Sequence, residues 1–103
     1  MNLGNAIKSV RKELDISQRK LAESCGISQT SLSQIETGTK RPSQRTLKKI
    51  CEVLNVPESI LYILGFLSTD MSANTNAEYQ KHLPSMQILA WKIVQENHKA
   101  IAV

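Results

Sequence analysis

Four uncharged polar side chains share one side of a short segment that follows a glycine. In a helix over residues 28–37, an arc of about 140° carries only amides and hydroxyls: Gln29, Thr30, Ser33 and Gln34. Leu32 and Ile35 lie on the opposite side. A glutamine amide donates and accepts at once, so it can bond two edge atoms of a DNA base, and a hydroxyl can serve either role. An ordinary solvated face is the alternative, but such faces usually carry Lys and Glu. The pattern therefore favours a surface that reads base edges.

The segment SQRKLAESCGISQTSLSQIETG, residues 17–38, has the spacing that two helices joined by a tight turn require. Ala22 is small where a second helix would cross. Gly26, four residues later, supplies the positive φ of the turn. Leu32, six residues further, supplies the apolar anchor of the second helix. The spacing predicts a helix-turn-helix unit.

Apolar residues at helical spacing continue on both sides of this unit. Leu3, Ile7, Val10 and Leu14 form one stripe, and Leu47, Ile50, Cys51 and Leu54 form another. Ser17, Ser28 and Ser43 are the expected N-caps, and Pro57 and Glu58 suit the first turn of a fifth helix. No strand is indicated. We predict an all-α, five-helix domain over residues 1–67.

The rest of the chain differs in composition. Residues 68–84 are polar and without apolar periodicity, and they are predicted to be a linker. A last helix is expected from Ser85 to Asn97, within a C-terminal segment over residues 85–103. That helix could associate with a second copy of the chain, which we favour, dock on its own domain, or bind another protein.

Charge and composition narrow the function classes. Apolar residues make up 41% of the 103 residues, enough for a packed core, and the formal net charge is +4. Residues 1–67 hold ten basic and six acidic side chains, whereas residues 68–103 hold three of each. The positive excess therefore lies in the predicted domain, which suits a polyanionic partner.

Enzymatic, metal-binding and membrane functions are poorly supported by the sequence. No secretion signal or run of membrane-spanning length is present, so we expect a cytoplasmic protein with no membrane association. Cys25 and Cys51 lie in apolar stripes and are expected to be reduced core residues. His82 and His98 lie in the tail without the spacing of a metal or catalytic site. We expect no enzyme activity, no metal and no cofactor.

Residues 3–64, about 60% of the chain, closely resemble the DNA-binding domain of the lambda-type phage repressors and Cro proteins, the Xre-like helix-turn-helix family. The resemblance implies that the helix over residues 28–37 enters the major groove of double-stranded DNA. It also implies that Gln29, Thr30, Ser33 and Gln34 contact bases. The implied phosphate contacts come from Gln18, Arg11, Lys40, Arg41 and Ser43. Arg11 and Glu36 match a pair of charged positions in the family and are expected to form a partly buried ion pair that directs Arg11 towards a phosphate.

A dimer is expected because one such helix reads too few base pairs for useful specificity. The candidate dimer interface consists of Tyr62, Ile63, Phe66, Leu67, Leu89 and Ile93. The expected function is a dimeric repressor that reads a palindromic operator. The family also includes antitoxins and restriction-modification controllers, so the C-terminal segment could instead bind a protein partner, such as a toxin or an antirepressor.

Overall fold

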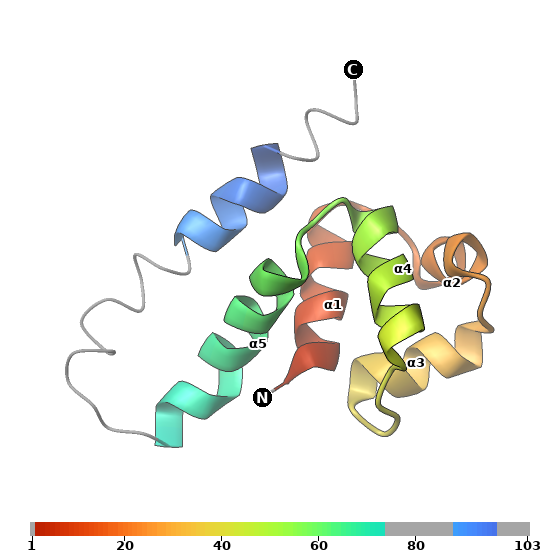
Figure 1. Cartoon of the computed structure of the whole chain (residues 1–103), viewed down its shortest axis with the longest axis horizontal. Helices are drawn as coiled ribbons and strands as arrows, with labels where there is room; N and C mark the ends of the chain where they lie inside the picture. Colours follow the sequence, from red (N-terminus) through yellow and green to blue (C-terminus); the bar gives the residue numbers. More distant parts are fainter. Residues whose placement is uncertain (1, 74–87, 97–103) are drawn as a thin grey trace.

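The computed structural model describes residues 2–73 and 88–96 of the chain, with side chains described for residues 2–65 and 88–96. Five helices follow one another: α1 (Leu3–Glu13), α2 (Gln18–Cys25), α3 (Gln29–Thr37), α4 (Gln44–Leu54) and α5 (Glu58–Ala73). Residues 88–96 form a further helix. Figure 1 shows α1, α4 and α5 gathered around the centre, with α2 and α3 on the side away from helix 88–96. The described residues contain no strand, and the predicted all-α class is confirmed.

Three helices begin at the serines expected to cap them. The backbone N–H of Lys20 donates to Ser17 Oγ at 3.0 Å, and the N–H of Ser31 donates to Ser28 Oγ at 3.0 Å. Ser43 accepts the N–H of Thr46 at 3.1 Å in the same way. Each bond satisfies a backbone donor that has no partner inside the helix. Local capping therefore determines where α2, α3 and α4 start.

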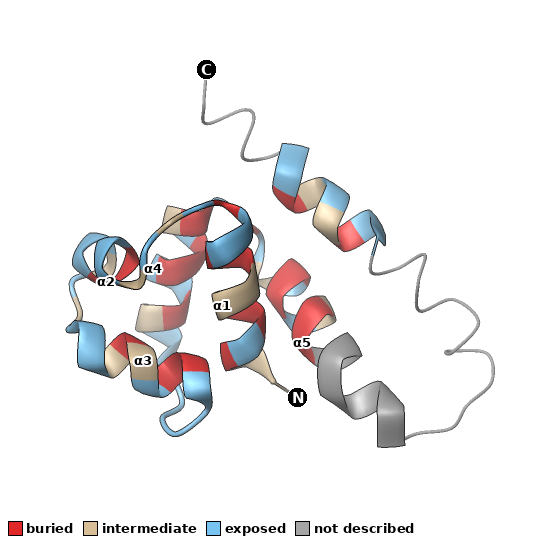
Figure 2. Cartoon of the chain, turned by 180° about the vertical axis from the view of Figure 1, so that it is seen from behind, coloured by how far each residue is buried: buried red, intermediate tan, exposed pale blue. Residues whose placement is uncertain are grey.

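The core is built from the apolar stripes of all five helices and of helix 88–96. Its fully buried side chains include Ile7, Leu21, Leu32, Ile50, Leu61 and Val94. In Figure 2 the buried positions face the centre of the domain, and exposed positions line the outer sides of α2 and α3. Cys51 is buried, whereas Cys25 is half-buried and packs against the edge of the core. Burial of this shared core is the main force that holds the short helices together.

The start of α1 approaches the end of α3 very closely. A Cβ added to Gly4 would clash with the carbonyl oxygen of Ile35 and lie 2.9 Å from that of Glu36. Just before it, the N–H of Asn2 donates to the carbonyl of Gly65 in α5 at 3.2 Å. Only a residue without a side chain fits at position 4. Asn2 and the start of α1 therefore pack between α3 and α5.

Helix α5 is longer than the sequence suggested. It continues to Ala73 and so includes residues 68–73, where the sequence predicts a linker. No proline or glycine interrupts that stretch, and extending an existing helix is far easier than starting one. The remainder of the predicted linker, residues 74–84, lies outside the described residues. No helix in the described part of the chain is long and apolar enough to cross a bilayer.

The helix over residues 88–96 packs against its own domain. Ala90 and Val94 are buried in the common core, and Gln95 Nε2 donates to Glu13 Oε1 at 3.1 Å. Docking within the monomer was the less favoured prediction for this helix, and it is the arrangement found. The docked face does not use all the apolar surface, because Ile88 and Leu89 remain 67% and 59% exposed. The ends of the predicted helix, residues 85–87 and 97, lie outside the described part.

Candidate nucleic-acid interface

The polar face of α3 is open to solvent. Gln29, Thr30 and Gln34 are exposed and Ser33 is half-buried, while Leu32 and Ile35 on the opposite side are 0% and 2% exposed. Helix 88–96 packs near α1 and α5, on the other side of the molecule (Figure 1). This face of α3 is therefore accessible to an external partner.

The turn between α2 and α3 has the geometry that its residues require. Gly26 has φ 70°, a left-handed conformation that a residue with a side chain adopts only at a cost. Its N–H and that of Ile27 bond to carbonyls of the last turn of α2, with Ile27 donating to Ala22 at 3.1 Å. Ala22 is buried where α2 meets the rest of the unit. The turn thus ends α2 and lets α3 begin in a new direction at the surface of the domain.

Arg11 and Glu36 form a buried ion pair between α1 and the end of α3. Arg11 Nε lies 2.8 Å from Glu36 Oε2, and Arg11 Nη2 donates to Glu36 Oε1 at 3.1 Å. The two side chains are only 9% and 1% exposed. A two-point bond of this kind fixes both distance and orientation. The pair therefore holds the C-terminal part of α3 against α1.

Gln18 extends this pair to the outer face. Its Nε2 donates to Glu36 Oε1 at 3.0 Å, and its Oε1 accepts from Gln29 Nε2 at 3.4 Å. A continuous set of hydrogen bonds thus runs from α1 through the start of α2 to the first residue of α3. The sequence placed Gln18 and Gln29 at an interface but did not indicate that they contact each other.

In the structure the guanidinium of Arg11 bonds to acceptors inside the domain. Its third nitrogen, Nη1, donates to the carbonyl of Ile16 at 2.9 Å, so every nitrogen of the guanidinium has an internal acceptor. Nη1 and Nη2 each carry a second N–H, so the phosphate contact of Arg11 stays a prediction. Arg11 also fixes Gln18 through Glu36, and Gln18 is half-buried where Arg11 is buried.

The loop after α3 carries the other predicted phosphate contacts. Arg41 is exposed and bonds to no other described residue. Lys40 is exposed, but its Nζ donates to Ser31 Oγ at 3.0 Å, a contact that the sequence did not suggest. Ser43 caps α4 and donates its own proton to Thr46 Oγ1 at 2.9 Å. Arg41 is the most available of the three for an external anion, and Ser43 the least.

The residues predicted to form a dimer interface are only partly exposed. Tyr62 is 38% exposed and Leu89 is 59% exposed. Ile63 and Ile93 are half-buried and pack against the core. The side chains of Phe66 and Leu67 lie outside the described residues. Among the described residues, the exposed large apolar side chains are Tyr62, Ile88 and Leu89.

The described residues offer no cluster of three His, Cys, Asp or Glu side chains that could bind a metal ion. His82 and His98 are outside this part of the chain. Burial raises the pKa of the Cys51 thiol to about 11, and nearby Glu58 adds to this rise. The pKa of Cys25 is also raised by burial, and the charge of Lys49 offsets part of that rise. Both thiols are therefore kept protonated at neutral pH.

Comparisons with known proteins point in the same direction as the geometry. A family model described as helix-turn-helix matches residues 7–61. An uncharacterized HTH-type transcriptional regulator of Mycobacterium tuberculosis is 40% identical over 60 residues, 58% of this chain and 43% of the relative. The ImmF control region 10 kDa protein of Bacillus phage phi105 is 41% identical over 59 residues, 57% of this chain and 66% of the relative.

An antitoxin, PezA of Streptococcus pneumoniae, is 43% identical over 54 residues, which are 52% of this chain and 34% of the antitoxin. In each of these three comparisons the similarity covers little more than half of this chain. The match spans less than half of the mycobacterial relative's length and about two thirds of the phage protein's length. The similarity therefore concerns the helix-turn-helix domain and not the whole of these relatives.

Proposed function

The chain belongs to the helix-turn-helix family of lambda-repressor-like DNA-binding regulators, which are not enzymes, and from this premise we propose that it is a dimeric transcriptional repressor. Helix α3 enters the major groove of a palindromic operator, and Gln29, Thr30, Ser33 and Gln34 contact base edges. Gln18 and Arg41 bond to phosphates on either side of the groove, and Lys40 assists.

One observation carries this proposal. The face of α3 that consists of amides and hydroxyls is exposed, while a buried ion pair at the end of the same helix holds it in place. Base readout requires side chains that are free to bond and a backbone that does not move on binding. The hydrogen bonds from Arg11 through Glu36 and Gln18 to Gln29 hold the backbone of α3 in place.

The dimer follows from the size of the reading surface. One α-helix reads a few base pairs, so family members bind two half-sites about 34 Å apart on one face of the duplex. Tyr62, Ile88 and Leu89 leave apolar surface exposed in the monomer, and large exposed apolar side chains are typical of interfaces. Leu89→Glu should weaken the dimer without unfolding the domain, because Leu89 is mostly exposed. Sedimentation at micromolar concentration measures this, and a monomeric wild-type protein would exclude the dimer.

Selection of bound duplexes from a random pool tests the function as a whole. We expect a palindromic consensus whose half-sites lie about one helical turn apart. The same selection with Gln34→Ala should give a consensus that is degenerate at one position of each half-site. No enrichment by the wild-type protein would reject sequence-specific binding, and enrichment of an asymmetric site would reject the dimeric mode.

A second function is favoured by one comparison. Because an antitoxin is among the relatives, we also consider that the chain represses its own operon and binds a protein partner through the C-terminal segment. The exposed Ile88 and Leu89 would provide the contact. Co-expression with the product of the neighbouring gene separates the two functions. A stable complex that Leu89→Glu disrupts supports the antitoxin, whereas a homodimer that binds its operator alone supports the repressor.

A further inference from the structure

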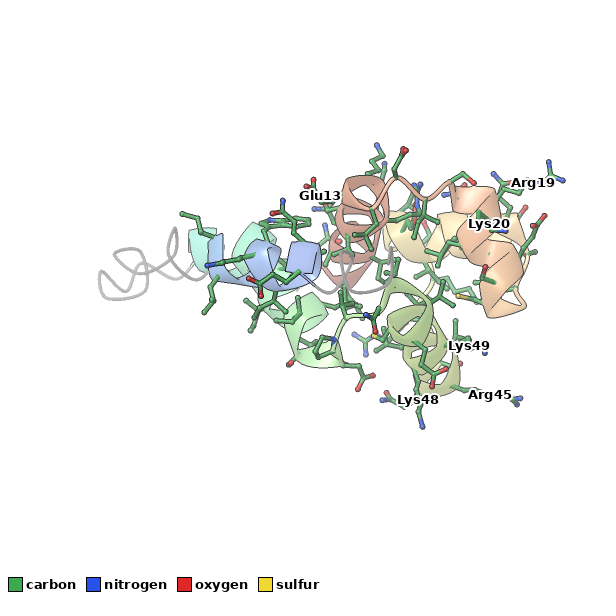
Figure 3. The ribbon with its side chains drawn as sticks, turned by 90° about the horizontal axis from the view of Figure 1, so that it is seen from above. Glu13, Arg19, Lys20, Arg45, Lys48 and Lys49 are labelled. Carbon is green, nitrogen blue, oxygen red and sulfur yellow. The ribbon has the colours of Figure 1, made fainter. Side chains whose placement is uncertain are left out.

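A group of exposed cations lies on α2 and α4, apart from the uncharged face of α3. We call it the α2–α4 basic surface, and it consists of Arg19, Lys20, Arg45, Lys48 and Lys49. Figure 3 shows these five side chains at the end of the molecule that is away from helix 88–96. Neither the base-reading residues nor the phosphate contacts proposed above include any of them.

A hollow of about 530 Å³ lies between the two helices. Cys25, Gly26 and Ile27, at the turn of the helix-turn-helix unit, form one wall, and Arg45, Lys48 and Lys49 line the α4 side. Lys49 lines this hollow together with Cys25, and its charge lowers the pKa of that thiol against the rise caused by burial. The cations of α4 therefore lie beside the turn that precedes α3.

Most of these charges are not neutralised within the described residues. The side chains of Lys20, Arg45, Lys48 and Lys49 form no hydrogen bond or ion pair there. Arg19 lies 3.2 Å from Glu23, but the two side chains are 78% and 61% exposed, so the pair holds them weakly. Glu52 is the only acidic residue that lines the hollow. The surface therefore attracts anions.

The face of α3 that is proposed to read bases carries no positive charge of its own for binding phosphates. DNA-binding proteins obtain most of their sequence-independent affinity by neutralising phosphates. Helix α3 carries no cation, and Arg11 is neutralised by Glu36. Among the phosphate contacts proposed above, Lys40 and Arg41 supply only two positive charges per subunit. The exposed cations of α2 and α4 are a further group able to neutralise phosphates.

We propose that the α2–α4 basic surface binds the phosphate backbone of duplex DNA beside the strand segments that flank α3. Lys48 and Lys49 each neutralise a phosphate, and Arg45 adds a third contact. This interaction is independent of sequence, and it rests on the proposed docking of α3 in the major groove. It supplies the affinity that the uncharged amides and hydroxyls cannot provide.

A pair of matched double variants tests the proposal. Lys48→Gln with Lys49→Gln removes two charges from the surface, and Lys12→Gln with Lys92→Gln removes two exposed charges elsewhere. Fluorescence anisotropy gives the Kd for a selected operator and for a scrambled duplex of the same length, at several salt concentrations. Circular dichroism during thermal unfolding shows that both variants are folded.

We expect the first variant to bind both duplexes more weakly, by at least about tenfold at 0.1 M salt, with an unchanged ratio between them. The slope of log Kd against log salt should fall by roughly 1.8 per subunit, and by roughly 0.9 for Arg45→Gln alone. The control variant should keep the wild-type slope. A wild-type slope in Lys48→Gln with Lys49→Gln, or a loss confined to the operator, would overturn the proposal. If wild-type protein fails to prefer the operator, the proposed function fails, while the slopes still decide this inference.

Discussion

Glu36 and Arg11, 25 positions apart in the chain, face each other through two hydrogen bonds in an interior site. Charges of this kind lose their hydration on folding, so a buried pair adds little to stability compared with apolar residues of the same size. The pair instead fixes the orientation of α3 relative to α1, because an apolar contact would let α3 rotate or slide against α1. The third partner, Gln18, is directed to the surface by the same carboxylate. The pair thus connects the interior of the domain to its reading face.

Replacement of Glu36 by Gln should lower both stability and DNA affinity. The substitution leaves the buried guanidinium of Arg11 without a counter-charge, which costs about 3 kcal/mol of the free energy of unfolding. Gln18 loses a carboxylate acceptor, so its amide is no longer fixed for DNA. Urea denaturation measures the first effect and anisotropy with operator DNA the second. Glu23→Gln, which breaks the exposed pair with Arg19, should change the free energy of unfolding by less than about 1 kcal/mol. Unchanged stability and affinity in Glu36→Gln would show that the pair has no structural role.

Features that depend on a few neighbouring residues could be predicted from the sequence. Ser17, Ser28 and Ser43 cap helices because a side-chain oxygen three residues before a free N–H is a local arrangement. Gly26 is left-handed because the turn between α2 and α3 has no other residue that adopts positive φ at low cost. Once the start and the end of α3 are known, helical periodicity shows which of its residues are exposed.

Features that depend on contacts between distant segments could not be predicted in this way. The stripe that includes Ala90 and Val94 shows which face of the last helix is buried, but not what covers it. Gln18 contacts Glu36 only because α1, α2 and α3 meet at one point. The end of α5 was missed because Ser, Thr and Asp after Leu67 are common in loops, yet a helix that has already formed can include them.

Replacement of Gly4 by Ala should be strongly destabilising, although alanine favours helices. The new Cβ would clash with the backbone carbonyl oxygen of Ile35, and the position of a Cβ is fixed by its own backbone, so no flexible side chain can move aside. We expect a loss of about 2 kcal/mol or more in the free energy of unfolding, measured by urea denaturation. Asn5→Ala, at the next and exposed position, is the control and should change stability by no more than about 0.7 kcal/mol. Equal stabilities of Gly4→Ala and wild type would mean that α1 and α3 are further apart.

The two cysteines should react at different rates with a thiol reagent. Cys51 is buried and its pKa is about 11, so about one thiol in a thousand is ionised at pH 8. Cys25 is only half-buried and lines the hollow between α2 and α4, although its pKa is raised as well. In native protein at pH 8, Cys25 should be modified first, and a higher pH should speed both reactions. Cys25→Ala and Cys51→Ala assign the two rates, and guanidinium should make them similar. Faster modification of Cys51 in the native state would contradict its burial.

Gln34 and Arg41 should differ in how their loss affects DNA binding, because one is proposed to read a base and the other a phosphate. Gln34 is exposed in the second turn of α3, so Gln34→Ala should leave stability unchanged and remove about 1–3 kcal/mol of discrimination at one base pair. Arg41 lies in the loop after α3, so Arg41→Ala should weaken binding to every duplex alike. The salt slope should fall by roughly 0.9 for Arg41→Ala and stay constant for Gln34→Ala. Kd values for the operator and for duplexes with single base-pair changes separate these effects. If Gln34→Ala weakened all duplexes equally, the amide face of α3 would not be the surface that reads sequence.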